Sequence, residues 1–396
     1  MTGYLMTEAE AARDLDRLDA VADPTGRWDA VLAGIALRFG AGRLEELGAA
    51  ARDLGGRRAL VVTDPGLRAA GHVDPALASL RRAGCDIVLF DRVEENPSSG
   101  MVATAAAAVA GQGADIVVGL GGGSALDAAK AINILLTNGG TMRDYWGYGK
   151  TREPLLPSIG VPTTAGTGSE AQSYALVFDP EIRRKMACGA ADARFGLVIL
   201  DPRLLVTAPR STVALAGMDA LSHALESFVT RDRTRSSCAL ARRAWTMLEP
   251  SYPKILDGDR EALAAMALGA HLAGAAIEQS MLGAAHAMAN PLTAELGVPH
   301  AAAVGLALPH VVRWNASSVG ALYDQLTGGS DGGMGLSLWL EEVRRRAGLP
   351  ERLREVGAEP DHLPRLAAAA TREWTGEHNP RRLSEADFLA LYEAAL

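Results

Sequence analysis

The sequence predicts a chain of two domains, an α/β domain with a mostly parallel sheet followed by an all-α domain. The chain has 396 residues, which is long for a single hydrophobic core. Short runs of Val, Ile and Leu alternate with helix-length stretches in its first half, whereas the second half has helical periodicity almost throughout. We therefore predict an N-terminal extension at 1–30, the α/β domain at 31–207 and the helical domain at 208–396.

The predicted sheet is built from five short apolar runs. Each is followed or bounded by turn residues, which is typical of strands buried on both faces of a parallel sheet. Helical patterns at 75–84 and 99–113 separate the first three runs, and this alternation indicates a doubly wound domain. The runs are RRALVVTD (57–64), CDIVLF (85–90), ADIVVGL (114–120), LPSIGVPTT (156–164) and FGLVILD (195–201).

The predicted helical domain begins near Ser211 and contains few β-branched runs. Its clearest helical stretches are 211–229, 236–249 and 261–289, and a glycine-rich loop is expected at 327–335.

Composition restricts the class of protein. The 39 basic and 47 acidic residues give a net charge of −8, which argues against a surface for nucleic acid or anionic membranes. The three cysteines include no CxxC pair, as is usual in a reducing compartment. The acidic N-terminus does not resemble a secretory signal, and no apolar run reaches the roughly 18 residues of a spanning helix. We expect a cytoplasmic protein with a small-molecule partner.

A glycine turn follows the third predicted strand. In DIVVGLGGGSALDAAK, the residues Gly121, Gly122 and Gly123 lack the Cβ atoms that would keep backbone amides away from a phosphate. The helix that follows offers oriented N–H groups to a dinucleotide. The alternative is a structural turn, with Ser124 as the N-cap and Asp127 three residues later.

Two further segments suit a dinucleotide. PSIGVPTTAGTGSE carries hydroxyl groups that either bind phosphate, ribose and carboxamide or cap the next helix. Asp64 follows the first predicted strand, where its carboxylate would accept from an adenosine ribose and repel the 2′-phosphate of NADP, although Asp-Pro-Gly is also an ordinary turn. The hydroxyl residues are Thr163, Thr164, Thr167 and Ser169.

Four potential metal ligands lie in the second half. Asp219 and His223 are four residues apart, so that on a helix they share one face. His286 and His300 are fourteen apart, far enough to reach one point from a helix and the loop after it. One carboxylate and three imidazoles suit a divalent metal such as iron or zinc.

These motifs, in this order, resemble those of the iron-containing alcohol dehydrogenase family, whose relatives include the more distant dehydroquinate synthase. The resemblance runs from FGAGRLEEL (39–47) through GGGSALDAAK, PTTAGTGSE and GMDALSHALE to HNPR (378–381). It implies a dinucleotide-binding domain, a helical domain and an active site in the cleft between them. It also implies a homo-oligomer, with a dimer favoured.

The resemblance assigns site residues by matching motifs. It implies that the metal ligands are Asp219, His223, His286 and His300. It implies that the cofactor contacts are Asp64, Gly121, Gly122, Gly123, Ser124, Asp127, Thr163, Thr164, Thr167, Ser169 and Lys185.

One departure from the family pattern concerns proton transfer. The family commonly has a second histidine four residues after the third ligand, and this chain has Asn290 there. Asn290 lies one helical turn from His286 and is expected to face the substrate, but an amide is neither acid nor base near neutral pH. The proton would then pass through a cofactor ribose hydroxyl, water, Glu278 or His271.

The resemblance implies a metal-dependent, NAD(P)-linked alcohol dehydrogenase or aldehyde reductase, with NAD favoured by Asp64 and Fe²⁺ favoured over Zn²⁺. One alternative is a reductase for an anionic aldehyde, such as phosphonoacetaldehyde or a semialdehyde. Another is a lyase or cyclase similar to dehydroquinate synthase. The last alternative is a binding or structural protein whose metal and cofactor site is vestigial.

Overall fold

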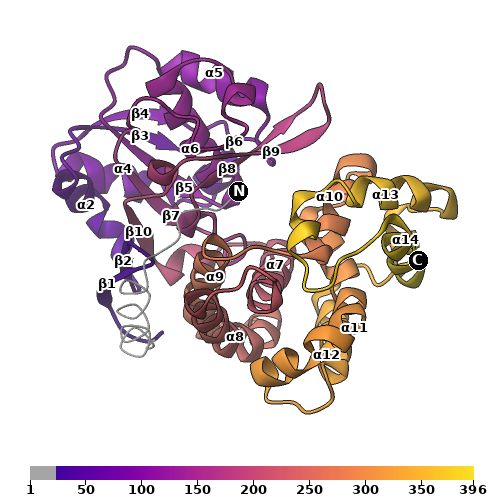
Figure 1. The fold of residues 1–396 in the computed structure, drawn as a ribbon. Coiled ribbons are helices and arrows are strands. Elements are labelled where there is room, and N and C mark those ends of the chain that lie inside the picture. Colours follow the sequence, from indigo (N-terminus) through magenta and orange to yellow (C-terminus); the bar gives the residue numbers. More distant parts are fainter. Residues whose placement is uncertain (1–23) are drawn as a thin grey trace. The chain divides into compact units, whose positions relative to one another are not determined.

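The computed structural model describes residues 24–396, and most of the predicted extension lies outside this range. Strand β1 (Trp28–Leu32) begins within the stretch predicted as extension, because WDAVL pairs with the strand that follows it. The chain divides into two compact units, and the division falls between Ala208 and Pro209 (Figure 1). We call these unit 1 and unit 2 and describe each by itself.

Unit 1 contains a seven-stranded sheet in the order β1-β2-β10-β7-β5-β3-β4. Strand β1 is antiparallel to β2, and all other neighbours in this sheet are parallel. The five strands predicted from apolar runs all form. The strands after β1 are β2 (Ile35–Phe39), β3 (Arg58–Val62), β4 (Asp86–Phe90), β5 (Ile116–Gly121), β7 (Ser158–Pro162) and β10 (Leu197–Leu200).

The strand order reverses at β3. From β3 the chain moves to its neighbour β4 at one edge, and then returns to β5 on the other side of β3 before continuing to β7 and β10. In doubly wound sheets such a reversal leaves a crevice at the carboxyl ends of the two central strands, where ligands bind. Here these ends are the ends of β3 and β5.

Helices connect these strands. Helix α6 begins directly after β5, and every residue from Ala125 to Leu135 is buried, so it is a central element of unit 1. The helices are α2 (Leu47–Asp53), α3 (Pro65–Ala69), α4 (Val73–Arg82), α5 (Ser99–Val109) and α6 (Gly123–Asn138).

Unit 1 also contains a second, three-stranded sheet, which was not predicted from the sequence. Its order is β6-β9-β8, with β6 at Gly147–Tyr148, β8 at Tyr174–Asp179 and β9 at Arg184–Gly189. The sequence of β9, RKMACG, contains no β-branched or aromatic residue, so its propensity did not indicate a strand.

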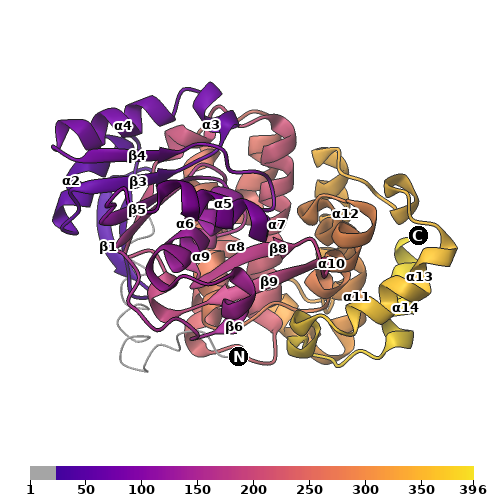
Figure 2. The ribbon, with the colours of Figure 1, turned by 90° about the horizontal axis from the view of Figure 1, so that it is seen from above.

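Unit 2 is helical, as predicted, and its described residues form no strand. Helices α13 and α14 pack side by side near the C-terminus (Figures 1 and 2). None of the described helices combines the length and the apolar character needed to span a membrane. The helices are α7 (Arg210–Val229), α8 (Arg235–Leu256), α9 (Ala262–Glu278), α10 (Ala284–Leu296), α11 (His300–Thr327), α12 (Met334–Ala347), α13 (Leu363–Ala370) and α14 (Glu385–Ala395).

Candidate metal centre and dinucleotide site

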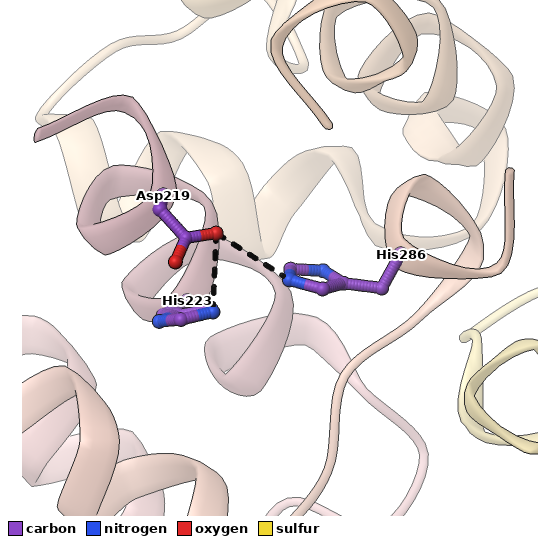
Figure 3. Close-up of side chains that lie close together, drawn as sticks. All are labelled: Asp219, His223 and His286. Carbon is purple, nitrogen blue, oxygen red and sulfur yellow. Dashed lines mark ion pairs between the residues drawn. The ribbon is translucent and has the colours of Figure 1, made fainter. Parts of the chain in front are cut away.

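A buried cluster in unit 2 brings together three of the four predicted ligands. Asp219 and His223 lie one turn apart on α7, and His286 faces them from α10 (Figure 3). Oδ1 of Asp219 lies 3.5 Å from Nε2 of His223 and 3.9 Å from Nε2 of His286. One ligating atom from each residue lies within 4.8 Å of the others.

The chemistry of this cluster fits a divalent metal. A carboxylate and two imidazoles are buried together, and this combination of side chains binds divalent transition metals. Nε2 of His286 is buried and makes no hydrogen bond within residues 24–396. A ring nitrogen that points at a carboxylate and a second imidazole is what a metal ligand requires.

The fourth predicted ligand, His300, lies beside this cluster. It is the first residue of α11 and is half-buried. Its ring centroid lies 5.3 Å from that of His286. Its nitrogen atoms are not part of the three-residue group described above.

Glu226 fixes the orientation of His286. Its Oε2 lies 2.5 Å from Nδ1 of His286, and its Oε1 accepts a hydrogen bond from the backbone N–H of Ala285 at 2.8 Å. A carboxylate at Nδ1 places the ring proton there and leaves Nε2 as the electron-pair donor. Glu226 lies one turn beyond His223 on α7, and from the sequence it was expected to pair with or support a ligand and not to be a fifth ligand.

The three predicted catalytic residues, Asn290, His271 and Glu278, lie in two helices of unit 2. Asn290 is on α10, and its Nδ2 donates a hydrogen bond to Oε2 of Glu373 at 2.8 Å. His271 and Glu278 lie seven residues apart on α9 and are both buried. Their roles stay predictions. Glu373 was missed, because no local signal relates it to a residue 83 positions earlier.

In unit 1, the ends of β3 and β5 bring Asp64 to the glycine turn. A Cβ atom on Gly121 would lie 3.1 Å from Oδ2 of Asp64 and 2.6 Å from Cβ of Ala125. Gly121 also has a φ of +150°, which side chains rarely adopt. Asp64 is the N-cap of α3, where Oδ1 accepts from the N–H of Leu67 at 2.9 Å.

The threonine segment lies against the same turn. A Cβ atom on Gly122 would lie 3.4 Å from the side chain of Thr164, and one on Gly123 would lie 2.6 Å from Cγ2 of Thr167. The N–H of Thr163 donates to the carbonyl of Gly121 at 3.0 Å. The structure therefore assembles the glycine turn and three predicted threonines at one place.

The N-terminus of α6 does not have the cap expected for a purely structural turn, in which Ser124 would be the N-cap. The N-cap is Gly122, which has no side-chain cap, and not Ser124. Ser124 lies inside the helix, and its Oγ accepts from the N–H of Asn96 at 3.1 Å. A helix that starts without a side-chain cap keeps N–H groups for an anion.

Asp127 and Ser169 contact each other behind this turn. Oγ of Ser169 donates to Oδ1 of Asp127 at 2.6 Å, and Nζ of Lys130 donates to the carbonyl of Ser169 at 2.6 Å. Burial raises the pKa of Asp127, and the charges of Lys130 and Lys185 oppose that rise. These contacts tie the threonine segment to α6, and they support a structural role for Asp127 and Ser169.

Two features define the class of protein. Unit 1 has a glycine turn where the strand order of its parallel sheet reverses, and unit 2 has a buried Asp/His cluster. Together they are typical of metal-dependent oxidoreductases that use a nicotinamide dinucleotide. The sequence profile described as "Iron-containing alcohol dehydrogenase" matches residues 36–202, and that described as "Fe-containing alcohol dehydrogenase family, C-terminal" matches residues 213–396. The chain belongs to the iron-containing alcohol dehydrogenase family.

Characterised relatives cover nearly the whole chain. It is 32% identical to a 1,3-propanediol dehydrogenase of Klebsiella pneumoniae over 371 residues, which is 90% of this chain and 96% of the relative. It is 32% identical to a lactaldehyde reductase of Escherichia coli (strain K12) over 373 residues, 90% of this chain and 97% of that protein.

Solved structures agree with this assignment. A crystal structure of a 1,3-propanediol oxidoreductase superposes with a TM-score of 0.88 at 31% identity, covering 94% of this chain and all (100%) of that one. An iron-containing alcohol dehydrogenase of Thermotoga maritima has a TM-score of 0.83 at 32% identity, with 93% and 99% covered. The protein is an alcohol or aldehyde oxidoreductase that acts on CH–OH groups, and its cofactors are NAD(P) and a divalent metal.

Proposed function

We propose that this protein interconverts a small, uncharged aldehyde and its alcohol, with NAD as the preferred dinucleotide and Fe²⁺ as the preferred metal. The observation that carries this proposal is the buried cluster of Asp219, His223 and His286. The relatives named for propanediol and lactaldehyde act on small uncharged substrates, which supports the substrate class. We also propose a cytoplasmic homo-oligomer, with a dimer favoured.

The metal would be held by Asp219, His223 and His286, with His300 as the fourth ligand. When bound, the metal supplies a Lewis acid that polarises the substrate oxygen, and the nicotinamide supplies or accepts the hydride. Glu226 keeps Nε2 of His286 available for coordination by holding the proton at Nδ1. Burial of the cluster excludes water, which strengthens each electrostatic interaction within it.

The glycine turn and the start of α6 would hold the pyrophosphate of the dinucleotide. Residues Gly121 to Gly123 keep side chains away from the backbone amides, and Thr164 and Thr167 line the same turn. Asp64 has one carboxylate oxygen bonded to its own helix, while the other faces Gly121. A negative charge at this point repels a 2′-phosphate, which supports NAD over NADP.

The Asn290–Glu373 contact supports an uncharged substrate. Asn290 lies one turn beyond His286, so a carboxylate bonded to it adds negative charge near the proposed metal. An anionic aldehyde would approach this charge at a cost, whereas a neutral aldehyde or a hydroxyaldehyde would not. Because Asn290 does not titrate, proton transfer is left to Glu278, His271, a ribose hydroxyl or water.

The test is a reduction assay on protein purified anaerobically, with its metal content measured. Propionaldehyde and a hydroxyaldehyde represent neutral substrates, and succinic semialdehyde represents anionic ones. We expect NADH to be consumed in equal amount to a neutral aldehyde, with a higher kcat/KM than for the anionic aldehyde and than with NADPH. A preference for succinic semialdehyde would contradict the substrate class. Activity without net NADH consumption would favour a reaction like that of dehydroquinate synthase.

A further inference from the structure

One asparagine near the C-terminus, Asn379, is hydrogen-bonded to two of the three helices that carry the proposed metal ligands. Its neighbour His378 is hydrogen-bonded to the residues that directly follow the third of these helices. We propose that Asn379 is a positioning residue that holds the ligands of α7, α10 and α11 in register. This inference rests on the ligand set proposed above, and it adds a residue that contacts none of the reacting atoms.

The first connection is to α10. Oδ1 of Asn379 accepts a hydrogen bond from the N–H of Ala284, the first residue of α10, at 3.2 Å. The next N–H, of Ala285, donates to Glu226. The first N–H groups of a helix have no partner within it, so buried ones need acceptors from elsewhere. Asn379 and Glu226 supply them, and so fix the turn that presents His286.

The second connection is to α11, which begins at His300. Asn379 and Asn315 exchange two hydrogen bonds, from Nδ2 of Asn315 to Oδ1 of Asn379 at 3.0 Å and from Nδ2 of Asn379 to Oδ1 of Asn315 at 2.8 Å. Both side chains belong to residues that are 1% exposed. Buried polar pairs of this kind permit few alternative arrangements.

The third connection is to the end of α7, which carries Asp219 and His223. The carbonyl of His378, next to Asn379, accepts hydrogen bonds from Oγ1 of Thr230 at 2.8 Å and from the N–H of Arg231 at 2.9 Å. These two residues directly follow Val229, the last residue of α7. The segment that carries Asn379 is therefore attached to the helix that supplies two ligands.

The space around these contacts is filled. A Cβ atom on Gly283, just before α10, would lie 2.8 Å from Oε1 of Glu226 and 3.0 Å from Oδ1 of Asn379. The two acceptor oxygens therefore pack so tightly against the start of α10 that a methyl group at position 283 would not fit. Because a metal tolerates ligand displacements of only about 0.2–0.5 Å, a loss of this bonding should appear in metal affinity.

The experiment measures the dissociation constant for Co²⁺ by competition with a chelator, together with the visible absorption spectrum of the Co²⁺ protein. We expect Asn379→Ala to weaken Co²⁺ binding by about 10- to 100-fold and to change the spectrum, as for other residues that orient metal ligands. Asn379→Asp keeps an acceptor for the N–H of Ala284 but loses the amide donor, so it should weaken binding less. The dissociation constant for NADH should change by less than about twofold, because the glycine turn belongs to unit 1.

A matched control comes from unit 1. Asn133 is also buried, and it exchanges two hydrogen bonds with the backbone of Leu156. Asn133→Ala should lower Tm and leave the Co²⁺ dissociation constant unchanged. If Asn379→Ala does not fold, Asn379→Asp and Asn315→Ala carry the same test.

The proposal is overturned if the Asn379 variants lower Tm as Asn133→Ala does but keep the wild-type Co²⁺ affinity and spectrum. A separate variant, His286→Ala, tests the ligand set itself. If Co²⁺ binding survived that substitution, the ligand assignment would fail, whatever the result at Asn379.

Discussion

At the scale of single residues, the two ring nitrogens of His286 have different partners, and this difference determines what the cluster can bind. The carboxylate of Glu226 is bonded both to Nδ1 of His286 and to the N–H of Ala285, so the acceptor is held in place and the ring cannot turn without breaking the hydrogen bond at Nδ1. Nε2 is left beside Asp219. Glu226 therefore fixes both the tautomer of His286 and the position of the start of α10. It belongs to the proposed metal site because it orients a proposed ligand, although it is not a proposed ligand itself.

Asn290 allows a residue-scale prediction about proton transfer. We expect Asn290→His to add an ionisation to the pH–rate profile of aldehyde reduction, because imidazole titrates near pH 6.5 and lies one turn from His286. The carboxylate of Glu373 would stabilise the imidazolium and move this pKa upward. The rate should rise below that pKa, where the imidazolium can donate a proton, by up to ~10²-fold.

The control for this prediction is Asn290→Gln, which keeps an amide and adds one methylene. Steady-state rates between pH 5 and pH 9 would be compared for both variants and the unaltered protein. If the His and Gln variants had profiles of the same shape, position 290 would not shape proton transfer.

At the scale of elements, the join between β5 and α6 determines how closely a dinucleotide can approach. We expect Gly123→Ala to weaken NADH binding by about tenfold and to cost about 1–3 kcal/mol of stability, because the new methyl would overlap Thr167 and force the threonine segment away. The overlap is severe, since the added Cβ would lie 2.6 Å from Cγ2 and 2.8 Å from Oγ1 of Thr167. Fluorescence titration with NADH and thermal unfolding measure the two effects.

Gly100→Ala is the matched control for this substitution. Gly100 lies at the second position of α5, as Gly123 lies at the first position of α6, but a Cβ atom there would meet nothing within 4 Å. Alanine at this point should stabilise the helix by up to about 1 kcal/mol and leave NADH binding unchanged. If the Gly123→Ala and Gly100→Ala variants bound NADH with equal affinity, the glycine turn would not be part of the dinucleotide site.

The elements also show which parts of the fold could be predicted from the sequence. The five buried parallel strands were predictable because their apolar runs are continuous and bounded by turns. Strand β9 was not, because its residues have low β-propensity and its formation depends on pairing with β8. Gly122 as the N-cap of α6 was also missed, because Ser124 has the stronger capping propensity and the glycine turn overrides it.

The same limit applied to the site. Asp219 and His223 were predictable as a pair because four residues make one helical turn. Contacts between distant segments carry no such period. Glu226 meets His286 across 60 residues, and Asn379 meets Ala284 across 95. The candidate ligands could therefore be predicted from motifs, and a supporting role for Glu226 from its place one turn after His223. Its partner His286 and the contacts of Asn379 could be found only in the structure.

At the scale of the whole molecule, the glycine turn proposed to bind the dinucleotide lies in unit 1, and the Asp/His cluster proposed to bind the metal lies in unit 2. Each unit should therefore respond to its own ligand. A ligand that binds only the folded state stabilises it in proportion to its occupancy, by ~2.7 kcal/mol at 100 times its dissociation constant. We expect the bound ligand to suppress local unfolding most strongly in the helices and strands that it holds together.

Metal removal tests this division. We expect chelation to speed amide hydrogen exchange at the start of α10 and in the part of α7 that carries Asp219 and His223, by up to ~100-fold at high initial occupancy, because buried ligands then lose their shared cation. Strands β3 and β5 should exchange as before. NADH added to the metal-free protein should slow exchange at the start of α6 and leave α10 unchanged. Hydrogen exchange followed by mass spectrometry resolves these segments. Uniform acceleration through both units would show that the metal stabilises the chain as a single body and that the two units do not respond separately.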